Sequence, residues 1–189
     1  MKFRGVVCMA LLALLAAGCG GAEREYTVRK SLCGVKVDPE LVKPFLADGK
    51  KLYYSEEGWD QNMFTHCFLR VDKTYDLNVT GQWRAKGYTT RKAADEMAHH
   101  PVTFSANGTY AVWERGAATV IPCKFPKISV GRLDGKKIPD GTRIPAGALS
   151  VRVASKELPE DTEASEDAMG RFIVAYAKGL RKVLPCESG

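Results

Sequence analysis

The fold is decided by residues 63–83, which read MFTHCFLRVDKTYDLNVTGQW. Apolar and polar side chains alternate on both sides of a polar break at residues 72–74, and such alternation is typical of strands with one buried face. The segment therefore predicts a hairpin of two antiparallel strands. The face expected to point into the core carries Met63, Thr65, Cys67, Leu69, Val71, Tyr75, Leu77, Val79, Gly81 and Trp83.

Capping residues and apolar periodicity predict three helices around this hairpin. The first begins at the N-cap Asp38 and is ended by Asp48-Gly49. A short second helix follows Thr89 or Thr90, and the longest covers about residues 165–184. The core face of the longest helix is expected to hold Met169, Phe172, Ile173, Tyr176, Leu180, Val183 and Leu184.

The remaining segments are expected to supply further strands and loops. The chain has 189 residues, of which 45% are hydrophobic, enough for one compact core. Residues 123–147 are rich in Gly, Pro and cations and are predicted to be loops around a short strand at 128–133. We predict a single α+β domain over residues 26–189, an antiparallel sheet packed by an N-terminal helix and a long C-terminal helix. Its other expected strands are 51–57, a second hairpin over 104–113, 118–123 and 149–153.

The N-terminus has the order of an export signal. Lys2 and Arg4 precede an uncharged apolar run that is too short for a stable spanning helix. Ala16-Ala17-Gly18 before Cys19 resembles the lipobox of bacterial lipoproteins, although a larger aliphatic residue usually stands where Ala16 does. We expect a signal peptide over residues 1–18, then a lipidated Cys19 and a short linker over 19–25. The alternative is an ordinary secreted protein cut near Gly18, with Cys19 as an odd thiol.

Four cysteines remain once Cys8 leaves with the signal and Cys19 is acylated. An even number in an exported chain predicts two disulfides, and three pairings are open. We favour Cys33 with Cys67 and Cys123 with Cys186, because each link joins the start of one half of the chain to a later element of that half. The functional alternative is a metal site or a redox pair, but the sequence contains no Cys-x-x-Cys.

Motifs for several common chemistries are missing from the sequence. It contains no Gly-x-Ser-x-Gly, Ser-x-x-Lys or His-Glu-x-x-His, and residues 131–137 depart from a phosphate-binding loop. Asp95 with His99 and Glu96 with His100 are spaced to chelate a metal on one helix, but acids early and histidines late also complement the helix dipole. We therefore predict no catalytic residues, no metal and no cofactor.

The charge balance bears on the class of partner. The precursor carries a net charge of +6, and residues 1–18 contain two cations and no acid, so the mature chain carries about +4. So mild a balance does not favour nucleic acid as a partner. A local basic segment could bind anionic phospholipid heads or wall polymers, although such a run is more often a solvated face. This candidate anionic-ligand surface consists of Lys124, Lys127, Arg132, Lys136, Lys137 and Arg143.

The cysteine contexts carry a resemblance. Leu32-Cys33-Gly34 precedes a proline-capped helix, Thr65-His66-Cys67 follows, and the chain ends on Val183-Leu184-Pro185-Cys186. With the lipobox, this pattern resembles small cell-envelope lipoproteins of actinobacteria, and the Cys33 to Cys67 spacing is similar to that of a family with a PsbP-like α/β sandwich. The resemblance covers most of residues 30–186. It implies no known activity and no catalytic residues, and some relatives are regarded as envelope binding or sensing modules.

These observations predict a non-enzymatic domain tethered by an N-terminal lipid to the extracytoplasmic face of the cell membrane. It is expected to bind a protein partner, a wall polymer or a small ligand at the cell surface. One alternative is an envelope enzyme whose site is assembled from scattered Asp, Glu, His and Tyr residues. The other is a carrier of lipid or small molecules in the sandwich.

Overall fold

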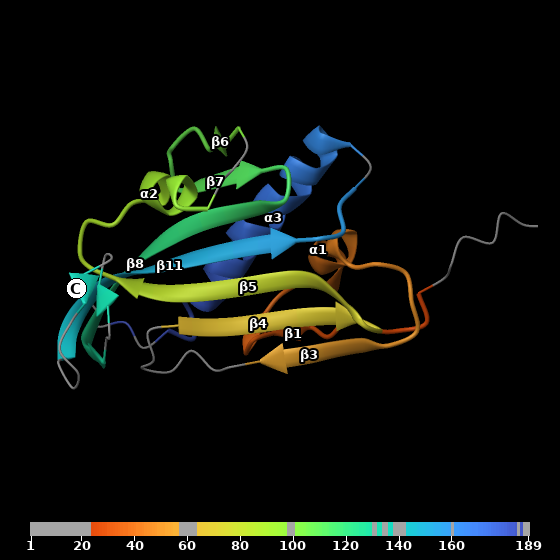
Figure 1. Cartoon of the computed structure of the whole chain (residues 1–189), viewed down its shortest axis with the longest axis horizontal. Coiled ribbons are helices and arrows are strands. Elements are labelled where there is room, and N and C mark those ends of the chain that lie inside the picture. The colour runs from red at the N-terminus through yellow and green to blue at the C-terminus, as the bar shows by residue number, and fades with distance from the viewer. Residues whose placement is uncertain are drawn as a thin grey trace, which may run out of the picture.

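The structure is a computed structural model of the chain. It describes residues 24–56, 64–97, 101–129, 132–133, 136–137, 143–159, 161–184 and 186. Seven antiparallel strands form the main sheet in the order β3-β4-β5-β11-β8-β7-β6 (Figure 1). Their bounds are β3 Leu52–Glu56, β4 Phe64–Val71, β5 Thr74–Arg84, β6 Thr103–Phe104, β7 Tyr110–Trp113, β8 Gly116–Ser129 and β11 Arg143–Ser155.

Shorter elements complete the described chain. Two small hairpins join β1 Ser31–Leu32 to β2 Val35–Lys36, and β9 Arg132–Leu133 to β10 Lys136–Lys137. The helices are α1 Pro39–Val42, which runs into the 3₁₀ turn η1 Lys43–Phe45, then α2 Thr90–Asp95 and α3 Thr162–Leu180. None of these described helices is long and apolar enough to cross a membrane. The α+β class and the antiparallel sheet are as the sequence predicts.

The sheet has an inner face, covered by α3, and an outer face on the opposite side. In Figure 1 α3 lies behind the sheet and runs obliquely across its strands. Phe172 and Tyr176 on α3 are fully buried and stack with ring centroids 5.6 Å apart, and Phe45 packs edge-on against Phe172 at 5.8 Å. The alternating residues of the predicted hairpin meet this layer, because Cys67, Leu69, Val71, Leu77, Val79 and Trp83 are all buried in the same cluster.

The hairpin of β4 and β5 contains a bulge that the alternation did not reveal. Leu69 pairs with Leu77, but the next residue, Arg70, pairs with Tyr75, so Asp76 is an extra residue in β5. The bulge turns Tyr75 to the outer face, where the side chain is 61% exposed, and buries Asp76. The prediction that Tyr75 faces the core is therefore wrong, since one inserted residue reverses the alternation.

The N-terminal helix is shorter than predicted. Asp38 caps it, accepting a hydrogen bond from the Glu40 amide at 3.0 Å, but regular α-helix ends at Val42. Pro44 explains the stop, because its nitrogen has no hydrogen to donate to the carbonyl four residues back and its ring crowds the preceding turn. The chain tightens into η1, which still buries Phe45.

The C-terminal helix begins earlier and ends earlier than residues 165–184. Asp161 caps it, accepting from the Glu163 amide at 2.8 Å. After Leu180 the chain leaves the helix, and Val183, which the periodicity places on the core face, is 50% exposed. The helix passes close to β2 at Gly179, where an added Cβ would lie 2.8 Å from the Lys36 carbonyl oxygen.

Both predicted disulfides are confirmed. Cys33 bonds to Cys67 with Cα atoms 5.9 Å apart, which ties the β1–β2 hairpin to β4. Cys123 bonds to Cys186 with Cα atoms 5.1 Å apart, which ties β8 to the chain beyond α3. Each link joins segments that flank the inner core, so both restrain the layer between the sheet and α3.

The segment expected to be loops is largely β-structure. β8 continues past Cys123 to Ser129, and β11 begins at Arg143, with Arg143 pairing Ser129. The register slips twice between Ile144 and Ala148, where extra residues of β8 are accommodated. Such slips allow a ladder to continue past prolines, which cannot donate a ladder hydrogen bond.

Candidate functional site

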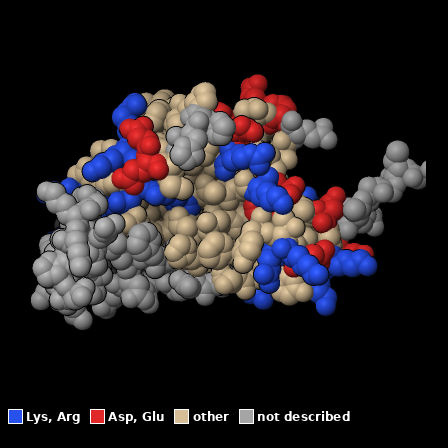
Figure 2. All heavy atoms as spheres, viewed as in Figure 1, with Lys and Arg blue, Asp and Glu red and all other residues tan. Residues whose placement is uncertain are grey.

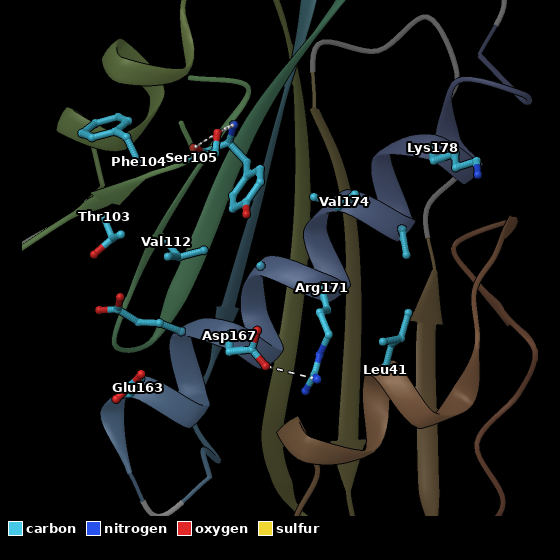
Figure 3. A pocket seen from close by; sticks show the side chains of 14 residues that line it. Leu41, Thr103, Phe104, Ser105, Val112, Glu163, Asp167, Arg171, Val174 and Lys178 are labelled. Carbon is cyan, nitrogen blue, oxygen red and sulfur yellow. Dashed lines mark hydrogen bonds and ion pairs between the residues drawn. The ribbon is translucent and has the colours of Figure 1, made fainter. Parts of the chain in front are cut away.

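A groove lies between α3 and the β6–β7 edge of the sheet (Figure 3). Its volume is about 750 Å³, within the range of sites for small molecules or short peptide segments. The apolar part of the lining comes from Tyr110 and Val112 on the edge strands and from Val174 on α3, whereas the Phe104 ring packs on the α2 side, beneath Arg91. Val174 is 47% exposed although it lies mid-helix, so the groove offers unsatisfied apolar surface.

Local structure fixes the edge side of this groove. The turn between β6 and β7 is closed by the Ser105 amide donating to the Tyr110 carbonyl at 3.0 Å. The Ser105 hydroxyl accepts from the Tyr110 amide at 3.1 Å, and the turn takes Gly108 at a φ of +65°. Gly170 on α3 has no side chain, and an added Cβ would lie 3.4 Å from the Tyr110 ring. The ring therefore packs directly over the helix.

Charged side chains line the groove asymmetrically. Glu163, Glu166 and Asp167 lie along the N-terminal half of α3, whereas Lys178 lies near its C-terminal end (Figure 3). Asp167 pairs with Arg171 one turn on, at 3.1 Å, and both side chains are well exposed. An occupant would meet an apolar floor, an acidic end and a basic end, an arrangement that fits an elongated amphipathic ligand.

Two buried serine hydroxyls donate hydrogen bonds to the main chain. Ser155 donates to the Asp76 carbonyl at 3.1 Å, and Ser165 donates to the Glu114 carbonyl at 2.9 Å. Among the described residues, no group of three or more His, Cys, Asp or Glu is placed to hold a metal ion. These hydroxyls act as structural hydrogen-bond donors, and neither serine lies in an arrangement that would activate it.

A polar cluster on the outer face holds α2 against the sheet. Glu96, just beyond α2, accepts from Arg84 at 2.7 Å and also pairs with Arg152, while Arg84 lies 4.4 Å from the centre of the Tyr88 ring. Burial raises the pKa of Glu96, but hydrogen bonds from Tyr88 and Arg152 and the charges of both arginines outweigh it and leave the pKa lowered. The carboxylate therefore stays ionised.

The contacts of Glu96 in this cluster differ from the metal-binding role that the sequence allowed for Glu96 with His100. Its carboxylate is occupied by two guanidinium groups, and His99 and His100 lie outside the described residues. His66 precedes Cys67 on β4, so the two side chains point to opposite faces of the sheet, and the His66 ring stacks on Phe68 with centroids 5.6 Å apart. His66 therefore packs against an aromatic ring, and the Cys67 sulfur is bonded to Cys33.

The basic segment is placed only in part. Lys124 is exposed on β8, and the backbones of Lys127, Arg132, Lys136, Lys137 and Arg143 lie on β8, β9, β10 and β11, but their side chains are not among those described. Cys19 also lies outside the described residues. The anionic-ligand surface and the lipidation therefore remain predictions.

The groove was not found from the sequence. Its one local signal is Val174, an apolar residue off the core face of a helix, and such residues are common on protein surfaces. Tyr110 and Val112 read equally well as ordinary strand residues. Only the tertiary structure shows that these side chains line one depression.

Comparisons of the chain with protein-family models, with curated proteins and with solved structures find no match.

Proposed function

We propose that this protein is a non-enzymatic binding domain, anchored by a lipid on Cys19 to the extracytoplasmic face of the membrane. We further propose that the groove between α3 and the β6–β7 edge takes a segment of a partner protein. The groove carries the proposal, because it combines exposed apolar side chains with charged groups on a rigid frame.

The compartment is supported by the N-terminal sequence and the cysteines. A positive start, a short apolar run and Cys19 after Ala-Ala-Gly are typical of an export signal and resemble a lipobox. The two disulfides, Cys33–Cys67 and Cys123–Cys186, are typical of chains that fold in an oxidising compartment. An anchored domain with its own rigid frame is suited to present a surface at the cell boundary.

The character of the occupant follows from the lining. Tyr110, Val112 and Val174 favour apolar side chains, and Glu163 with Glu166 favours a cation at the N-terminal end of α3. An extended peptide segment carries apolar and cationic side chains at fixed spacing. A wall polymer built of sugars and phosphates would gain little from the apolar floor.

The test is site-specific photo-crosslinking in intact envelopes. Benzoylphenylalanine replaces Val174 in the groove or Val183 outside it, a matched control because both valines lie at or beyond the same helix and are 47% and 50% exposed. We expect a discrete protein adduct at position 174 that is absent at 183 and is weakened by E163Q with E166Q. The same adducts at both positions, or a lipid adduct at 174, would overturn the proposal.

A further inference from the structure

The described chain begins at a fixed point on the domain. Arg24 pairs with Asp48 at 3.1 Å and donates to the Leu46 carbonyl at 2.8 Å. The Glu25 amide donates to the Gly49 carbonyl at 2.9 Å. These contacts hold the start of the domain beside the segment that enters β3.

The turn between β4 and β5 lies at the same end of the sheet. The Asp72 amide donates to the Lys51 carbonyl at 2.8 Å, and the Asp72 carboxylate accepts from the Lys50 and Lys51 amides at 3.2 and 3.0 Å. The exit of the N-terminal linker, the start of β3 and the β4–β5 turn therefore form one connected surface, which we call the tether end.

The reach of the linker is short. Five peptide steps separate Cys19 from Arg24, and fully extended chain spans at most about 17 Å over that number of steps. A lipid on Cys19 would therefore keep the tether end within about that distance of the membrane surface.

The tether end carries the side chains that favour an anionic lipid surface. Tyr53 and Tyr75, 44% and 61% exposed, flank Arg70, whose guanidinium lies 5.4 and 5.5 Å from their ring centres. Tyrosine side chains are enriched at membrane–water interfaces, where the ring is apolar and the hydroxyl is wet. The bulge at Asp76 is what turns Tyr75 to this side.

The charges around these tyrosines are mainly positive. Lys50, Lys51 and Lys73 are exposed beside Arg70. Asp48 is paired with Arg24, and Glu25 and Asp72 are the acids that oppose them. Figure 2 shows Lys and Arg side chains gathered, with some acids among them, at the right-hand end of the outer face, the end where the described chain starts in Figure 1.

We propose that the tether end rests on an anionic phospholipid bilayer, with Tyr53 and Tyr75 at the headgroup level and the lysines against lipid phosphates. This inference rests on the proposed anchoring through Cys19. The tyrosines lie on the outer face of the sheet, and the groove lies on the inner, α3 side. Docking in this way leaves the groove open to partners away from the membrane.

The experiment anchors the protein chemically. The mature chain, residues 19–189, is coupled through the Cys19 thiol to a maleimide-bearing phospholipid in vesicles, because the four other cysteines are paired. Benzoylphenylalanine replaces Tyr75 or, as the control, Val183, which is also exposed and lies beyond the far end of α3. The vesicles contain phosphatidylglycerol in phosphatidylcholine, or phosphatidylcholine alone.

We expect lipid adducts at position 75 to exceed those at 183 by about tenfold in the anionic vesicles, and to fall in phosphatidylcholine alone. Changing Lys50, Lys51 and Lys73 to Gln should reduce the adduct at 75 to the control level. Changing three exposed lysines elsewhere, Lys36, Lys86 and Lys182, should leave it unchanged.

Equal adducts at 75 and 183, or adducts at 75 that ignore the three lysines, would overturn the docked orientation. Because the anchor is supplied in the experiment, such a result would leave the proposed anchoring and groove untouched. An absent acyl group on Cys19 in cells would instead contradict the anchoring itself.

Discussion

The inner and outer faces of the main sheet are built on different physical terms. The inner face is apolar throughout its cluster, with aromatic side chains of α3 packed against alternate residues of the strands. The outer face is covered by α2 at one end, through small alanines and the Glu96 ion pairs, and at the tether end it exposes tyrosines and cations. We therefore expect substitutions on the inner face to cost the most stability, and we place the candidate membrane-binding surface on the outer face.

The largest expected effect is on the inner face. Replacing Phe172 by Ala removes a fully buried ring that contacts Phe45 and Tyr176 and leaves a cavity, so the free energy of unfolding should fall by about 4 kcal/mol. Val174→Ala on the same helix, at a half-exposed site, should change it by less than about 0.5 kcal/mol. Urea unfolding measures both, and equal losses would remove the distinction between the two sides of α3.

The next effect concerns the link between β8 and the end of the chain. Removing the Cys123–Cys186 disulfide by changing both residues to Ala should lower the free energy of unfolding by about 4 kcal/mol, because the closed loop spans 63 residues. Denaturant unfolding of the oxidised protein and the double variant gives the value. No change would mean that α3 packs as firmly without its covalent restraint.

On the outer face, Glu96→Gln should cost about 1 to 2 kcal/mol at neutral pH. Arg84 is only 7% exposed and would lose its ionic partner, but the Glu96 side chain is 35% exposed, so solvent screens part of the effect. The pKa of Glu96 is lowered in the fold, so its contribution is present above the ordinary carboxyl pKa and is lost as pH falls through the lowered value. The variant should show a flatter loss of stability in acid, and an unchanged acid limb would contradict the ion-pair account.

Replacing Asp76 should change the free energy of unfolding in the opposite direction to replacing Glu96, and by less. Burial raises its pKa more than the hydrogen bond from the Ala47 amide lowers it. The folded protein therefore holds this proton more tightly, and the contribution of Asp76 is most favourable at low pH and is lost as pH rises through the raised pKa. Asp76→Asn keeps the acceptor for Ala47 and should gain up to about 1 kcal/mol at neutral pH. Thermal unfolding against pH measures this, and a large loss at neutral pH would show that the charge itself is needed.

The same contrast explains what the sequence could predict. Alternation along residues 64–71 and 77–83 and the periodicity around Phe172 and Tyr176 report burial on one side of one element, and Asp38 marks the start of a helix. They placed most of the inner face correctly, and the even number of cysteines predicted two disulfides, for which the favoured one of three pairings is the one found. These features depend on short-range patterns that any strand or helix with one buried face must show.

The features that the sequence did not predict depend on single irregularities of the backbone or on contacts between residues far apart in the chain. One extra residue at Asp76 reversed Tyr75, Pro44 cut the first helix short, and paired strands replaced loops beyond Cys123. The groove unites Val112 with Val174, residues far apart in the chain whose local patterns are ordinary. The tether end likewise depends on contacts between residues 24–25, 46–51 and 72.

Intact-mass measurement of the natively exported protein from the membrane fraction, with thiol alkylation before and after reduction, tests the anchored-domain proposal most directly. The account predicts a chain that begins at Cys19, carries acyl groups there and takes up alkylating reagent only after Cys33, Cys67, Cys123 and Cys186 are reduced. A lipid-free mass, or a retained segment 1–18, would contradict the anchor, and free thiols among those four cysteines would contradict the disulfides.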